Sequence, residues 1–171
     1  MKSRKPKCVL SAAIVLLLVM LLLGCTNPST QIQDSLRDYS RIITEDFPED
    51  LCLTIYYLDP SILTRRPLSV EDLMTFPETQ KIVIEAEELS TNIESFKKLN
   101  ASMLKPAKEK VYVDARLYYV LDAGENNKVL DVVISQTDSG VIMNGIEVAY
   151  NPIFHELVAP FLPNAGDDAL P

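Results

Sequence analysis

The sequence contains a single histidine, His155, so it cannot assemble a histidine-rich zinc site. A catalytic general base also needs a partner and a pocket, and the neighbouring Glu156 would not share a helix face with His155. With five glycines, the chain has no glycine-rich phosphate loop and no serine in a Gly-x-Ser-x-Gly motif. We therefore predict no metal, no cofactor and no enzymatic activity. Hydrolysis by the carboxylates of Asp114, Asp131 or Glu147 is the remaining catalytic alternative, and it would need two of them in one cleft.

The N-terminus has the layout of a secretory signal, with a basic segment followed by a short apolar stretch. The apolar stretch runs from Val9 to Leu23, which is shorter than the roughly 20 residues of a transmembrane helix. It ends in Leu22-Leu23-Gly24-Cys25, which resembles the lipobox of bacterial lipoproteins. The resemblance implies that the signal peptide, residues 1–24, is removed and that Cys25 receives the lipid. An uncleaved membrane anchor and an ordinary secretory signal are the alternatives.

Lipidation at Cys25 implies a protein held by its lipid on the extracytoplasmic face of a cell membrane, because two or more acyl chains anchor a protein stably.

Cleavage before Cys25 would leave 147 residues with 12 basic and 24 acidic side chains, a net charge of −12. A surface this acidic repels nucleic acid and anionic lipid headgroups. Cys8 lies in the signal, so Cys52 is the one remaining thiol and no intramolecular disulfide can form.

Residues 25–29 are predicted to be a lipidated tether, residues 30–163 a single domain and residues 164–171 a disordered acidic tail. Capping-box spacing predicts helices that begin at Thr30 and at Thr91, the first ending near Phe47 and the second near residue 103. A short helix is expected after Ser69. β-Branched and aromatic residues predict strands at residues 51–58 and 81–87.

The clearest strand pattern covers residues 110–122, where apolar and polar side chains alternate. A returning strand at residues 129–135 and a hairpin around Asn144-Gly145 complete a C-terminal meander, and Asn151-Pro152 begins a last helix. Consecutive hairpins beside three to four helices predict an α+β fold with an antiparallel sheet. The order of elements is similar to that of small exported cystatin-like or nuclear-transport-factor-like domains, a likeness of fold that implies no function.

The outward face of the 110–122 strand is the candidate binding site, because tyrosine and arginine are enriched at protein interfaces. It would carry Tyr112, Asp114, Arg116 and Tyr118, with Tyr118 near Val133 and Arg116 near Ser135. The alternative is that Asp114 and Arg116 make cross-strand or diagonal pairs and a helix covers the tyrosines. Arg65-Arg66 is a second candidate because two cations stand out on an acidic surface.

These features predict a lipid-anchored surface protein whose domain binds an envelope protein or an extracellular ligand. The alternative is a lipoprotein that binds a small molecule or a cation in a pocket between sheet and helices.

Overall fold

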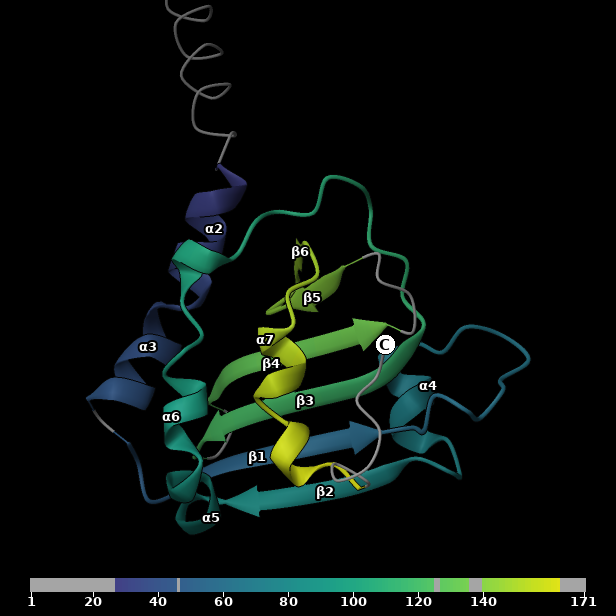
Figure 1. The fold of residues 1–171 in the computed structure, drawn as a ribbon, viewed down its shortest axis with the longest axis horizontal. Helices are drawn as coiled ribbons and strands as arrows, with labels where there is room; N and C mark the ends of the chain where they lie inside the picture. The colour runs from purple at the N-terminus through teal and green to yellow at the C-terminus, as the bar shows by residue number, and fades with distance from the viewer. Residues whose placement is uncertain (1–26, 46, 125–126, 136–139, 164–171) are drawn as a thin grey trace, which may run out of the picture.

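The protein forms an antiparallel six-stranded sheet with helices packed against it, which confirms the predicted α+β class (Figure 1). The computed structural model describes residues 27–45, 47–124, 127–135 and 140–163. The expected signal peptide, Cys25 and the expected acidic tail lie outside the described residues. The strand order is β2-β1-β3-β4-β5-β6. The strands are β1 (Leu51–Tyr57), β2 (Gln80–Glu85), β3 (Ala115–Ala123), β4 (Lys128–Ser135), β5 (Val141–Met143) and β6 (Ile146–Val148).

The main core lies between one face of this sheet and most of the helices (Figure 1). Leu53, Tyr119 and Leu121 project into it from β1 and β3, and each is fully buried. Two tyrosine hydroxyls in this core reach helical carbonyls: Tyr39 Oη donates to Phe96 O at 2.7 Å and Tyr119 Oη donates to Phe154 O at 2.8 Å. The helices around this core are α2 (Pro28–Ser35), α3 (Arg37–Thr44), α5 (Ala86–Thr91), α6 (Ile93–Phe96) and α7 (Ile153–Glu156).

The helix expected to begin at Thr30 begins earlier and is broken in two. Asn27 is its cap, accepting a hydrogen bond from Ser29 N at 3.0 Å, and Pro28 occupies the first turn. Proline favours this position because its fixed φ already suits a helix. Pro28 and Ser29 therefore belong to α2 and not to a tether. At Leu36 the backbone leaves helical geometry, with φ −97° and ψ 0°, and α3 follows.

The helix predicted from Thr91 to about residue 103 is also corrected. A helix instead starts directly after β2, as α5, and Thr91 is its last residue. The Thr91 hydroxyl donates to Glu88 O at 2.7 Å and therefore does not cap a following helix. Between α6 and β3 the chain forms one 3-10 turn, η1 (Ala101–Met103), capped by Asn100.

Strand β3 begins at Ala115, five residues later than the alternating pattern predicts. The register shifts between Ala115 and Leu117, so Ala115 and not Arg116 lies opposite Ser135. Ser135 Oγ bonds instead to the backbone of the preceding segment, at Asp114 N (3.3 Å) and Tyr112 O (3.0 Å). These bonds replace the ladder where the strand was expected to continue. The predicted opposition of Tyr118 and Val133 is confirmed.

The Asn144-Gly145 hairpin forms as predicted, with Val141 opposite Val148 and Met143 opposite Ile146. Both turn residues have positive φ, 48° for Asn144 and 75° for Gly145. Such a turn matches the twist of the two strands. Asn144 Oδ1 accepts from Asp131 N at 2.7 Å and its Nδ2 donates to Ser35 O at 3.0 Å. The side chain therefore joins the hairpin to the end of α2.

The opposite face of the sheet carries a second, smaller core beneath α4 (Val70–Thr75). Ser69 caps α4 as predicted and forms a capping box with Asp72. Leu73 of α4 is fully buried in this core with Leu58 and Leu68. The chain leaves β1, packs against this face through α4 and returns to the sheet edge as β2. No helix within the described ranges is both long and apolar enough to span a membrane.

Candidate functional site

Asp114 and Arg116, two of the predicted binding residues, form a buried pair that holds a loop in place. Arg116 is 6% exposed, and its guanidinium donates to Ile62 O and to Thr64 Oγ1, each at 2.9 Å. The same guanidinium approaches Asp114 Oδ2 at 3.4 Å. The other carboxylate oxygen of Asp114 accepts from Leu68 N at 3.0 Å. Both side chains therefore bind the segment that follows β1, here named the anchored loop (residues 59–68).

Tyr118 and Tyr112, the other two predicted residues, lie in different environments. Tyr118 is 9% exposed, belongs to the core beneath α4 and stacks on Tyr56 with ring centroids 6.0 Å apart. Tyr112 is 61% exposed and precedes the strand. The four residues therefore do not make one open face. The alternative of cross-strand pairs beneath a helix fits only in part, because Asp114 and Arg116 pair with each other two residues apart and Tyr112 is exposed while Tyr118 is buried.

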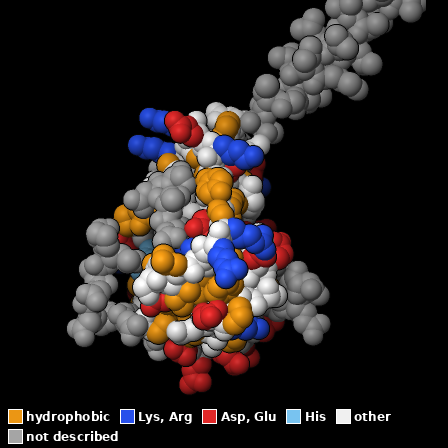
Figure 2. Space-filling view, turned by 90° about the vertical axis from the view of Figure 1, so that its right-hand side faces the viewer, with side chains coloured by type: hydrophobic (Ala, Val, Ile, Leu, Met, Phe, Trp, Pro, Cys, Tyr) orange, Lys and Arg blue, Asp and Glu red, His pale blue; other side chains and the backbone are white. Residues whose placement is uncertain are grey.

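The anchored loop presents one large apolar side chain and two arginines to solvent. Leu63 is 90% exposed, the largest exposed fraction among the large hydrophobic residues that the structure describes. Arg65 and Arg66 follow it and are exposed, and Arg66 pairs with Asp72 of α4 at 2.9 Å. Figure 2 looks onto this end of the molecule, where basic side chains lie beside hydrophobic ones (Figure 2). An apolar tip beside two cations is thus presented on an otherwise acidic domain.

Because Arg116 is buried, breaking its contacts with the anchored loop would cost free energy. Its Nε has no hydrogen-bond partner among the described residues, although its other nitrogens are bonded. Removing the guanidinium would leave Asp114 and two loop acceptors without their partner, and an unsatisfied buried group costs about 1–3 kcal/mol. Leu68 is held from both sides, since its carbonyl also accepts from Ala115 N at 2.9 Å. The loop therefore rests on a fixed support, which is the usual setting of binding loops.

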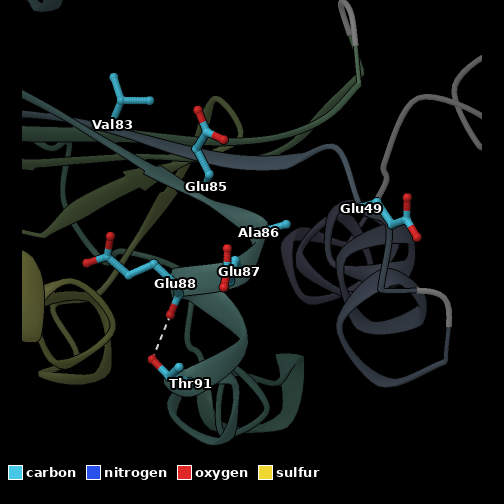
Figure 3. A pocket seen from close by; sticks show the side chains of 7 residues that line it. All are labelled: Glu49, Val83, Glu85, Ala86, Glu87, Glu88 and Thr91. Atoms are coloured by element: carbon cyan, nitrogen blue, oxygen red, sulfur yellow. Dashed lines mark hydrogen bonds between the residues drawn. The ribbon is translucent and has the colours of Figure 1, made fainter.

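An acidic hollow of about 620 Å³ lies where β2 meets α5 (Figure 3). Its carboxylates are those of Glu49, Glu85, Glu87 and Glu88. The hollow is open, and Glu49, Glu85 and Glu88 stand apart without converging on one point (Figure 3). No group of three or more His, Cys, Asp or Glu side chains in the described part of the chain is arranged to hold a metal ion. The hollow lies at the β2 edge of the sheet, beside α5.

The carboxylates considered for hydrolysis have separate structural partners. Asp131 pairs with Lys128 at 2.8 Å, and Glu147 accepts from Val111 N at 3.1 Å.

His155 lies in α7, where burial lowers the pKa of its imidazole and the charge of Glu156 raises it by less. Cys52 is half-buried on β1 with a free thiol.

Sequence reasoning identified Arg65-Arg66 and Arg116 separately but did not connect them. The connection spans 54 residues between Arg116 and Ile62 and leaves no local pattern. A signal does exist in the unusual placement of an arginine within an apolar strand, since arginine is almost never buried without partners. No family model, curated protein or solved structure matches this chain.

Proposed function

We propose that this protein is a bacterial surface lipoprotein, held at the outer face of a cell membrane by lipid on Cys25, whose acidic domain binds another envelope protein without catalysis. The sequence Leu22-Leu23-Gly24-Cys25 supports the anchor. The observation that carries the binding role is the anchored loop, with Leu63 90% exposed above the buried guanidinium of Arg116.

The chemistry of the loop selects the kind of partner. Leu63 offers an apolar contact, and two cations lie within three residues of it: Arg65, and Arg66, which is paired with Asp72. A partner surface with a shallow apolar depression and carboxylates at its rim would satisfy both. Arginine suits such contacts because its planar guanidinium pairs with carboxylates through two hydrogen bonds.

The anchor makes a modest intrinsic affinity sufficient. Two proteins confined to one envelope surface meet at a high effective concentration, so a small contact area can support binding. The fixed base of the loop contributes as well, because a loop that is already ordered loses less conformational entropy when it binds.

Site-specific photo-crosslinking in the intact cell tests this proposal. A photoreactive residue at Leu63 should produce one crosslinked envelope protein, and Arg65→Glu should weaken that product. The same probe at Ser90, exposed on α5, is the matched control. Absence of a product at position 63, or the same product from both positions, would refute binding through the anchored loop.

A further inference from the structure

The two edge strands of the sheet differ in whether their outer backbone groups have a partner. At the β6 edge the segment 105–107 runs alongside the strand: Ala149 N donates to Lys105 O at 2.8 Å and Ala107 N donates to Glu147 O at 3.1 Å. Pro106 bridges to Val148 there. At the opposite edge β2 pairs with β1 alone, and none of the described residues forms a ladder on its outer side (Figure 1). The outer side of β6 therefore has a backbone partner, whereas the outer side of β2 has none among the described residues.

Strand alternation identifies which residues of β2 face the open edge. Leu58 N donates to Arg116 O at 2.8 Å, so this even-numbered residue turns its amide toward β3. Successive residues of a strand turn their amides to opposite sides, so the odd-numbered residues of β1 face β2. Ile55 lies opposite Ile82, which places the even-numbered residues of β2 toward β1. The backbone N–H and C=O groups of residues 81, 83 and 85 therefore point away from the sheet.

The side chains of these three residues are self-complementary. Lys81 and Glu85 are exposed at equal distances along the chain from Val83, which is 50% exposed. An antiparallel copy of β2 centred on Val83 would set Lys81 opposite Glu85 of the second copy and Val83 opposite Val83. Opposite charges directly across an antiparallel pair are stabilising and like charges are destabilising. A parallel copy in register would oppose like charges at both positions.

We propose that the partner of this edge is a second copy of the same chain, joined about a two-fold axis at Val83 into one continuous antiparallel sheet. Each pair of residues facing across the edge would exchange two backbone hydrogen bonds, and on the inner face Ile82 would meet Ile84 of the second copy. A charged edge strand usually keeps other chains away. Here Lys81 and Glu85 exclude most strands but match their own antiparallel image. This self-association is independent of the proposed lipid anchor and of the anchored loop.

A charge-exchange series on the full chain, purified in mild detergent and studied by sedimentation equilibrium, tests the proposal. The unaltered chain should form dimers. Lys81→Glu and Glu85→Lys should each weaken dimerisation about tenfold or more, because each places two like-charge pairs across the axis. The double variant K81E/E85K should restore it to within about threefold, because the opposite charges face each other again. Lys98→Glu, the same charge change at an exposed position in the turn after α6, should leave the dimer unchanged.

Backbone exchange supplies a second readout that side-chain charge does not control. The amide of Val83 should exchange with solvent deuterium freely in the monomer and slowly in the dimer. The proposal requires a dimer dissociation constant no higher than about 100 µM. A chain that stays monomeric at about this concentration would overturn it. So would a dimer insensitive to both single changes, or a double variant that remains monomeric. A soluble extended peptide that slows Val83 exchange while the chain stays monomeric would assign the edge to another partner.

Discussion

At the scale of single residues, Arg116 has the environment least expected from its chemistry. Its guanidinium is buried on the sheet face beneath the anchored loop, with Asp114 as its only ionic partner among the described residues. Arg116→Met keeps much of the side-chain volume but removes every donor. Since removing one member of a buried pair costs about 3–5 kcal/mol, the free energy of unfolding should fall by about 3 kcal/mol in urea titrations.

Arg65→Met is the control for that substitution, because Arg65 is exposed in the same loop. It should change stability by less than about 0.5 kcal/mol, as surface substitutions commonly do. Equal stabilities for the two variants would show that Arg116 does not hold the loop.

Asp122 gives the second prediction at this scale. Burial raises the pKa of its carboxyl above the usual 3.8, Lys128 lowers it and the charge of Asp131 raises it. A raised pKa means that the folded protein binds a proton more readily than the unfolded chain does. Ionisation of Asp122 therefore lowers stability at neutral pH, and this loss disappears as the pH falls below 3.8.

Asp122→Asn should accordingly raise the melting temperature at pH 7, and the gain over the unaltered protein should shrink as the pH is lowered toward 3.8. Thermal melts at several pH values measure this. Glu78→Gln, at an exposed position outside this cluster, should produce no such gain at pH 7. A gain from Asp122→Asn that does not change with pH would argue against the charge as its cause.

At the scale of secondary-structure elements, the hairpin turn shows how one side chain joins two parts of the fold. Asn144→Gly keeps the left-handed backbone conformation available but removes the bonds to Asp131 N and Ser35 O. With roughly 1 kcal/mol for each bond, stability should fall by about 2 kcal/mol. Gly145→Ala, where an added methyl meets no atom within 4 Å, should cost only the left-handed strain of about 1–2 kcal/mol.

Hydrogen exchange separates these two effects. The glycine at position 144 should loosen the end of α2 as well as the turn, because the bond to Ser35 is lost. The alanine at position 145 should affect the turn alone. Unchanged protection at the end of α2 in the first variant would show that Asn144 does not join the two elements.

The elements that the sequence predicted correctly are those determined by neighbouring residues. Strand β1, the Asn144-Gly145 hairpin and the cap of α4 at Ser69 depend on local alternation, turn conformation and capping. The helix expected from Thr91 failed although its spacing was correct, because β2 ends at Glu85 and the following residues enter α5 at once. A capping pattern indicates where a helix could begin and does not say whether one has already begun.

The candidate site was predictable only in part. The alternating pattern placed Asp114 and Arg116 on the outward face of the strand, which was predicted to be a binding surface. Their contacts with Ile62, Thr64 and Leu68 depend on how the chain returns over the sheet. The shift of register at Arg116 is equally invisible to an alternation pattern, which assumes an uninterrupted ladder.

At the scale of the whole molecule, the proposed anchor predicts the outcome of one substitution. Cys25→Ser should abolish incorporation of labelled palmitate and release the protein from stable membrane attachment, since lipid on this cysteine is the proposed anchor. Cys52→Ser is the control and should keep both the label and the membrane attachment. Labelling of the Cys25→Ser variant, or unchanged membrane attachment without any label in the unaltered protein, would refute lipidation at Cys25.

The position of β1 between β2 and β3 also constrains the order in which the chain can fold during synthesis. β1 pairs with β3 across a long sequence separation, with Leu51 opposite Ala123, whereas β3 and β4 are joined by a short turn. A ribosome makes the chain from its N-terminus, so the apolar segment Leu51–Tyr57 is complete well before its second neighbour exists. During that interval β1 has at most β2 beside it, and an unpaired edge of β1 can pair with a neighbouring nascent chain. Slower translation between residues 58 and 115 would lengthen this exposure and increase aggregation, whereas slower translation after residue 123 would not.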